Sequence, residues 1–273
     1  MYAEVPLALS TTFSLIGAGS FVTLSVVVGV SRLEQKRLTN LDTLSLMLTL
    51  AVVLGFVAAF FAFQDQTNAV SLFRGLNDVA WFVIVGVAGL FVAVAVLYGI
   101  RVNFGNIATD ERTFLLCLAG ASGVIFVGTI GMVPLLISSP SLSTVAMFVE
   151  MLGFALLGGS ALVSLMFEKV EALDSALTKM TLTLIAFFGV VMGCIGFAVQ
   201  VGVALGAGSD VVREASSQIV VAFFCLVASF VFEIMAIRIK ETGFHSVVAV
   251  ASAFVGVFSA CLVLYASLVT LLA

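Results

Sequence analysis

The sequence predicts an all-α integral membrane protein with eight transmembrane helices. Of the 273 residues, 62% are hydrophobic and 10% are charged, and the mean hydropathy is +1.30. A water-soluble domain carries about 25% charged residues, so this chain has too few to cover a surface that faces water. Its apolar stretches are long and uninterrupted, which favours helices over the alternating strands of a membrane β-barrel.

The polar breaks between apolar stretches define the predicted helices. A helix needs about 20 apolar residues to cross the hydrocarbon core of a bilayer. Stretches of about that length lie at 6–30, 43–63, 79–100, 113–137, 144–166, 180–206, 216–238 and 246–272. The connections are short, so no soluble domain or nucleotide-binding fold fits between the helices. We therefore expect a single polytopic membrane domain over residues 1–273.

Basic residues are distributed asymmetrically between the two sets of connections. Nine of the 11 Lys and Arg residues lie in the connections after the first, third, fifth and seventh predicted helices, and only Arg74 and Arg213 lie in the others. Loops rich in Lys and Arg stay on the cytoplasmic side of a membrane. The sequence therefore predicts that both termini lie on the outer side.

The composition argues against several functional classes. A single histidine argues against a bis-histidine haem, and four cysteines without a close pair argue against a CxxC zinc or iron–sulfur site. We therefore expect no metal, haem or iron–sulfur cluster in this chain. The net charge of −4 is small and gives no reason to expect nucleic acid as a partner.

Besides scattered Ser, Thr and Cys residues, Glu150, Glu233 and Gln200 stand out as polar side chains inside predicted helices. Glu150, about two turns into the fifth helix, is interpreted as a proton acceptor or a ligand for a buried polar head, the alternative being an uncharged structural carboxyl. Glu233 lies close to Arg238 and Lys240, which suggests a carboxylate that reaches the membrane interface. For Gln200, a binding role and a packing role stay equally open.

Small residues are expected to serve helix packing. Glycines at close spacing let two membrane helices approach each other. Such pairs are Gly17 and Gly19, Gly189 and Gly193, and Gly202 and Gly206. The cysteines are interpreted as small apolar packing residues.

The connection at residues 64–78 is long and polar. It carries seven amide, acid or guanidinium side chains, among them Arg74, a basic residue on the predicted outer side. A cation on the side that the charge bias disfavours suggests an anionic partner, such as Asp78, Glu4 or a docked subunit. The alternative is a loop that is simply solvated.

The N-terminal segment resembles the membrane anchor subunit of the dimethyl sulfoxide reductase family. That family opens with Glu-x-Pro-Leu, a Thr one turn later and a first helix rich in Ala and Gly. The matching residues are Glu4-Val5-Pro6-Leu7, Thr11, Phe13, Ala18-Gly19 and Phe21, with Gly55-Phe56 and Leu76-Asn77 further along. The resemblance covers about the first 80 residues, and the remainder agrees in hydropathy only.

The resemblance implies a role in electron transport during anaerobic respiration, in the plasma membrane of a prokaryote. Such anchors hold an iron–sulfur subunit and a molybdopterin catalytic subunit at the membrane, oxidise menaquinol and have no self-contained active site. On this basis the N-terminus and the 64–78 loop dock the iron–sulfur subunit, and menaquinol binds below that loop. The candidate residues are Glu4, Pro6 and Asp65 for docking, Gln64, Asn68, Arg74 and Gln200 for quinol binding, and Glu150 and Asp78 as proton acceptors.

The chain departs from the family at the quinol site. The family's loop histidine, a proposed proton acceptor, aligns with Ala62, and its proline aligns with Gln66. A hydroquinone that loses two electrons also loses two protons, so Glu150, Asp65 or Asp78 would have to accept them. Two alternatives stay open: an anchor that does not oxidise quinol, and a small-solute transporter.

Overall fold

The part of the chain that the computed structural model describes is entirely helical. It comprises residues 5–33, 41–64, 78–104, 108–132, 143–169, 175–239 and 243–272, and no strand forms within these ranges. The helices are α1 (Val5–Leu33), α2 (Leu41–Gln64), α4 (Asp78–Phe104), α5 (Thr109–Gly131), α7 (Thr144–Lys169), α8 (Ala176–Gly206), α9 (Asp210–Glu214), α10 (Ser216–Arg238) and α11 (Phe244–Leu272).

Among these described residues, seven helices are long and apolar enough to cross a membrane. They are α1, α4, α5, α7, α8, α10 and α11, and α2 contributes a shorter apolar segment, Leu44–Gly55. The chain is thus an all-α, multi-pass membrane protein, as its composition predicts. The helix expected at 113–137 lies earlier, as α5. Asp110 and Glu111 in its first turn suit the positive end of the helix dipole, which explains the earlier start.

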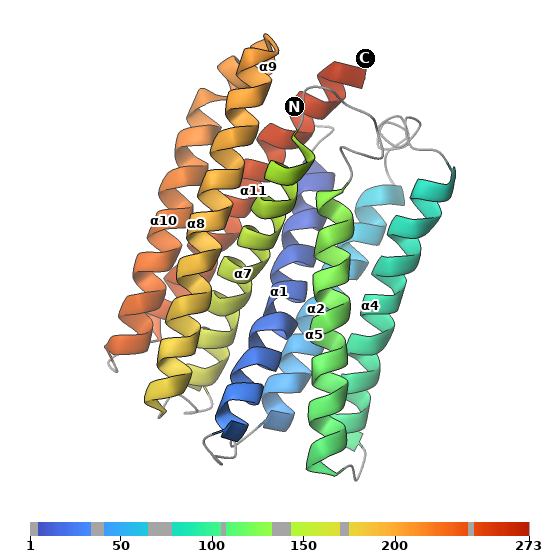
Figure 1. Ribbon diagram of the computed structural model, residues 1–273, viewed down its shortest axis with the longest axis vertical. Helices are drawn as coiled ribbons and strands as arrows, with labels where there is room; N and C mark the ends of the chain where they lie inside the picture. The colour runs from blue at the N-terminus through green and yellow to red at the C-terminus, as the bar shows by residue number, and fades with distance from the viewer. Residues whose placement is uncertain are drawn as a thin grey trace.

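The long helices form two groups of four (Figure 1). We call α1, α2, α4 and α5 the N-terminal four helices, and α7, α8, α10 and α11 the C-terminal four helices. They meet chiefly where α1 packs against α7. Within the most apolar 18-residue stretch of each helix, 61% of the residues are buried in α1 and 67% in α7. The corresponding share is 28% in both α4 and α10. These two helices therefore form the centre of the molecule, and the first turn of α1 lies at the same end as the last turn of α11 (Figure 1).

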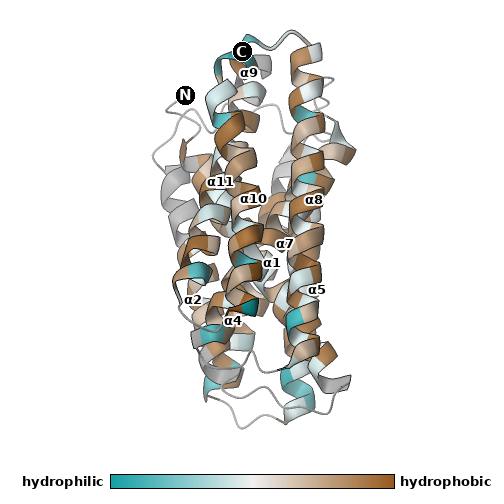
Figure 2. Ribbon diagram, turned by 90° about the vertical axis from the view of Figure 1, so that its left-hand side faces the viewer, coloured by the Kyte–Doolittle hydropathy of each residue, from teal (hydrophilic) through white to brown (hydrophobic). Residues whose placement is uncertain are grey.

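The outward face of the bundle is apolar. Hydrophobic residues run along the helices in Figure 2, and α10 exposes a stripe formed by Val220, Phe224, Val227 and Val231. The side chain of Phe224 is 73% exposed. A stripe of this kind is unfavourable in water, whereas lipid chains cover it at no cost. The outward face is therefore the lipid-facing surface.

Close approach of backbones holds the centre together. A Cβ atom at Gly159 of α7 would lie 2.1 Å from the carbonyl carbon of Gly19 in α1. On the other side of α7, a Cβ atom at Gly153 would lie 2.1 Å from the backbone nitrogen of Gly193 in α8. These contacts confirm the packing role predicted for Gly19 and Gly193. The same prediction for Gly202 is wrong, because its position faces open space.

Gly206 likewise has nothing within 4 Å of an added Cβ atom. Both residues of that pair are exposed near the end of α8. The spacing of two glycines therefore does not by itself identify a helix contact. What decides it is which face of the helix the neighbouring helices cover.

We expect Gly159→Ala to destabilise the protein by about 1–3 kcal/mol, because the added methyl group forces α1 and α7 apart. Gly202→Ala is the matched control, and it should leave stability unchanged or raise it by about 0.5–1 kcal/mol, as alanine favours helix. Thermal unfolding in detergent measures both. Equal unfolding temperatures for the two variants would contradict the tight contact between α1 and α7.

Candidate functional site

Glu150 lies on α7 and is completely buried. It is placed there because α7 is central and because Gly196 of α8 has no side chain. A Cβ atom at Gly196 would lie 2.7 Å from the Cβ of Glu150. Neither carboxyl oxygen has a hydrogen-bond partner within the described ranges. Buried polar groups are nearly always bonded, so this carboxyl stands out as a site for a proton or a ligand.

Polar side chains of α11 lie within electrostatic range of Glu150, namely Cys261 and Tyr265. The Tyr265 hydroxyl lies 2.8 Å from Oγ1 of Thr11, and the Thr12 hydroxyl donates to the carbonyl of Ala8 in its own helix at 2.7 Å. The prediction that places Glu150 inside the membrane domain is therefore confirmed. Whether it accepts a proton in catalysis stays a prediction.

Glu233 on α10 is also completely buried. The Oγ atoms of Ser160 and Ser164 lie 3.1 Å from its two carboxyl oxygens. The interpretation of Glu233 as a carboxylate that reaches the membrane interface is wrong. Its side chain instead packs against the face of α7 that carries these two serines. In the sequence, the spacing of Ser160 and Ser164 by one helical turn indicates a polar face on α7. Nothing in the sequence, however, shows that this face meets α10.

Gln200 makes a structural contact near the start of α7 and the end of α8. Its Nε2 donates to the carbonyl of Ser143 at 3.0 Å, and its Oε1 accepts from the backbone N–H of Ser143 at 3.1 Å. This pair ties α8 to the residue that precedes α7. These two hydrogen bonds support the packing role, which the sequence left open. A ligand-binding role for Gln200 stays a prediction.

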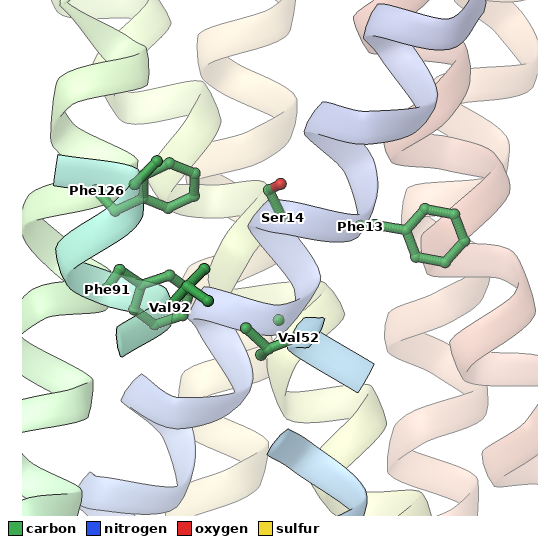
Figure 3. Close-up of a pocket in the computed structure, with 8 residues that line it drawn as sticks. Phe13, Ser14, Val52, Phe91, Val92 and Phe126 are labelled. Carbon is green, nitrogen blue, oxygen red and sulfur yellow. The ribbon is translucent and has the colours of Figure 1, made fainter. Parts of the chain in front are cut away.

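A small apolar pocket lies between the N-terminal four helices (Figure 3). It has a volume of about 10 Å³, which is room for no more than a single water molecule, and it is lined by Phe13, Ser14, Gly17, Val52, Ala88, Phe91, Val92 and Phe126. The rings of Phe91 and Phe126 stack with their centroids 5.5 Å apart. Figure 3 shows Phe13 turned away from them, toward the neighbouring C-terminal helix, where it contacts Phe254. The walls are apolar except for the hydroxyl of Ser14, and the space between the lining side chains is too small for an aromatic ring unless these side chains move.

The pocket and Glu150 lie apart. Residues from α1, α2, α4 and α5 line the pocket, whereas Glu150 belongs to α7 and its backbone and Cβ lie against Gly196 of α8. A ligand in the pocket therefore does not touch Glu150.

The remaining candidate residues lie at helix ends or outside the described ranges. Pro6 falls in the first turn of α1, where its missing N–H is tolerated. Gln64 ends α2 and Asp78 begins α4, so the chain between them starts and finishes at one end of the bundle. Glu4, Asp65, Asn68 and Arg74 lie outside the described residues.

The two buried carboxyls predict opposite effects of the same substitution. Glu150→Met should raise stability by about 1–3 kcal/mol, because it removes an unbonded buried polar group. Glu233→Met should lower stability by a similar amount, because it takes away the hydrogen-bond partner of Ser160 and Ser164. Thermal unfolding in detergent compares them. A loss of stability in Glu150→Met as large as that in Glu233→Met would show that Glu150 has a structural partner.

No protein-family model, curated protein or solved structure matches this chain. Its function is therefore inferred from the contacts described above and from the resemblance in its N-terminal segment.

Proposed function

We propose that this chain is the integral membrane anchor of a molybdopterin/iron–sulfur oxidoreductase complex in the plasma membrane of a prokaryote. It crosses the membrane eight times, with both termini on the outer side. The N-terminal motif around Pro6 supports the assignment, as does the placement of the first turn of α1 and the last turn of α11 at one end of the bundle. The concentration of Lys and Arg in alternate connections supports the orientation.

The observation that carries this proposal is the N-terminal motif, and the apolar pocket between the N-terminal four helices is the place that we propose for the quinol ring. Val52 lies 12 residues before the end of α2, and Ala88 lies ten residues after the start of α4. At about 1.5 Å per residue, the pocket is roughly 15–18 Å below the end where the 64–78 connection joins α2 to α4. The walls are apolar, as a menaquinol ring requires, and the lining side chains would have to move apart to admit the ring, with Ser14 as the hydroxyl that could bond to it.

Oxidation of the hydroquinone releases two electrons and two protons. The electrons pass to the nearest cluster of the iron–sulfur subunit, which docks on the outer end through Glu4, Pro6 and Asp65. A serine hydroxyl such as that of Ser14 is too weak a base at neutral pH to take the protons. The candidate acceptors are Asp78, Asp65 and Glu150, none of which lines the pocket. Asp78 begins α4, about 15 Å from Ala88, so water molecules would have to carry the protons to that end.

A menaquinone analogue should quench the fluorescence of Trp81, the only tryptophan, which lies two turns before the pocket on α4. Ala88→Phe fills the pocket and should weaken this binding by about tenfold or more, equivalent to about 1.4 kcal/mol. The matched control is Ala251→Phe at an exposed position of α11, which should bind like the parent protein. Equal weakening by both substitutions would contradict quinone binding in this pocket.

The anchor role is tested by affinity purification of the tagged chain from its native membrane. Partner subunits that contain molybdopterin and iron–sulfur clusters should be recovered with it. Glu4→Lys should lower their recovery several-fold, because the predicted docking end loses an acidic group. A chain recovered at full yield without any cluster-containing protein would contradict the proposal.

A proton-coupled transporter of small solutes is the second candidate. The specific observation in its favour is Glu150, a buried carboxyl without a hydrogen-bond partner in the described ranges, at the junction of α1, α7, α8 and α11. Intramembrane carboxyls of this kind often carry protons in transporters. Solute uptake by proteoliposomes that contain the chain alone would favour this candidate over the anchor.

A further inference from the structure

The two serine hydroxyls beside Glu233 have three acceptor oxygen atoms within hydrogen-bond distance. Ser164 Oγ lies 3.1 Å from Oε1 of Glu233, and Ser160 Oγ lies 3.1 Å from Oε2. Ser160 Oγ also lies 3.0 Å from the carbonyl oxygen of Leu157 in its own helix. All of these side chains are buried, so water does not complete their hydrogen bonds.

The number of protons decides how this network is satisfied. A serine hydroxyl carries one hydrogen and can donate it once. If Ser160 donates to Leu157, the contact with Oε2 is a hydrogen bond only when Glu233 carries a proton and donates it to Ser160. If Glu233 is ionised, Ser160 turns its hydrogen to Oε2 and releases Leu157. The same heavy-atom positions thus accommodate the site with and without a proton.

We propose that Glu233 is a proton-exchange site within the C-terminal four helices, open toward the end where α7 and α10 finish. The carboxyl releases its proton as the O–H bond of Glu233 breaks and a water molecule at that end takes the proton up. Ser160 rotates at the same time and replaces the lost donor. Uptake reverses these steps, so one proton moves in each direction and no other reactant is needed.

A polar stripe on α7 leads from Glu233 to the end of the bundle. Ser160, Ser164 and Glu168 follow one another at intervals of one turn and share a face of the helix. Glu168 is partly exposed, and it accepts a hydrogen bond from Ser246 at the start of α11. We assign the route of the proton to this stripe, from the buried site to the bundle end.

No cationic side chain among the described residues pairs with Glu233, so a bound proton is what neutralises its carboxylate. Among the described residues, no ion pair to Glu233 is found on any helix packed against α10. The titratable or charged groups on these helices toward the same end are Glu168 on α7, Lys179 on α8, Arg238 on α10 and His245 on α11. α9 carries Asp210, Arg213 and Glu214 at the opposite end. An ionised carboxylate without a cation is unfavourable inside a membrane, which favours a site that holds a proton.

This inference stands apart from quinol binding. The pocket lies between the N-terminal four helices, whereas Glu233 contacts only residues of α7 within the described network. Proton exchange at Glu233 can be measured without quinone and without partner subunits. Failure of either proposal therefore leaves the other intact.

Infrared difference spectroscopy of the full chain in phosphatidylcholine bilayers tests the proposal. On a change from acidic to alkaline buffer, the C=O stretching band of a protonated carboxyl should disappear, and replacing H₂O with D₂O should shift it. Glu233→Gln, which keeps the shape and the acceptor for Ser164, should abolish this band. Ser160→Ala should change its frequency, because the partner of Oε2 is lost.

Two controls assign the band. Ser20→Ala on α1 removes a buried hydroxyl that donates to its own helix at Ile16, and it should leave the band in place. Glu150→Gln should also leave it, which separates the two buried carboxyls. A difference spectrum that is unchanged in Glu233→Gln would overturn the proposal, and so would a band that D₂O does not shift.

Discussion

The structure depends on the contact between the backbones of α1 and α7. Two glycines, Gly19 and Gly159, remove the side chains that would keep these helices apart. In a membrane, where lipid competes equally for apolar surface, close backbone packing is what drives helices together. Because α7 meets α8 through Gly153 and Gly193 in the same manner, one central helix joins the two groups of four. Every polar contact discussed above lies on or next to this centre.

The two groups of helices have different interiors. The N-terminal four helices enclose aromatic and aliphatic side chains such as Phe91 and Phe126, and the small pocket between them has apolar walls. The C-terminal four helices bury Glu233 against two hydroxyls, and Glu150 lies where they meet α1. A hydrophobic ligand and a mobile proton need such contrasting surroundings, since one requires apolar walls and the other requires bonded oxygen atoms.

The helices were predictable because hydrocarbon thickness sets their length. The stretch at 144–166 corresponds to Thr144–Lys169, and the stretch at 216–238 corresponds to Ser216–Arg238. Glu150 was predictable as an interior carboxyl for the same reason. Glu233 was misread, because its distance in sequence from Arg238 suggests an interface and conceals the serines that face it from α7. Contacts between helices far apart in the chain leave no trace in hydrophobic periodicity.

The sequence by itself determined that this chain is helical and membrane-embedded, since its apolar runs match bilayer thickness and its few charges cannot cover a wet surface. Only the tertiary structure decided which faces of the helices meet. It buried Gly193 and left Gly202 open, and it placed the aromatic pocket and Glu150 in different surroundings. The reason is physical: hydrophobicity drives a helix into the membrane, whereas the complementary shapes of neighbouring helices orient it there.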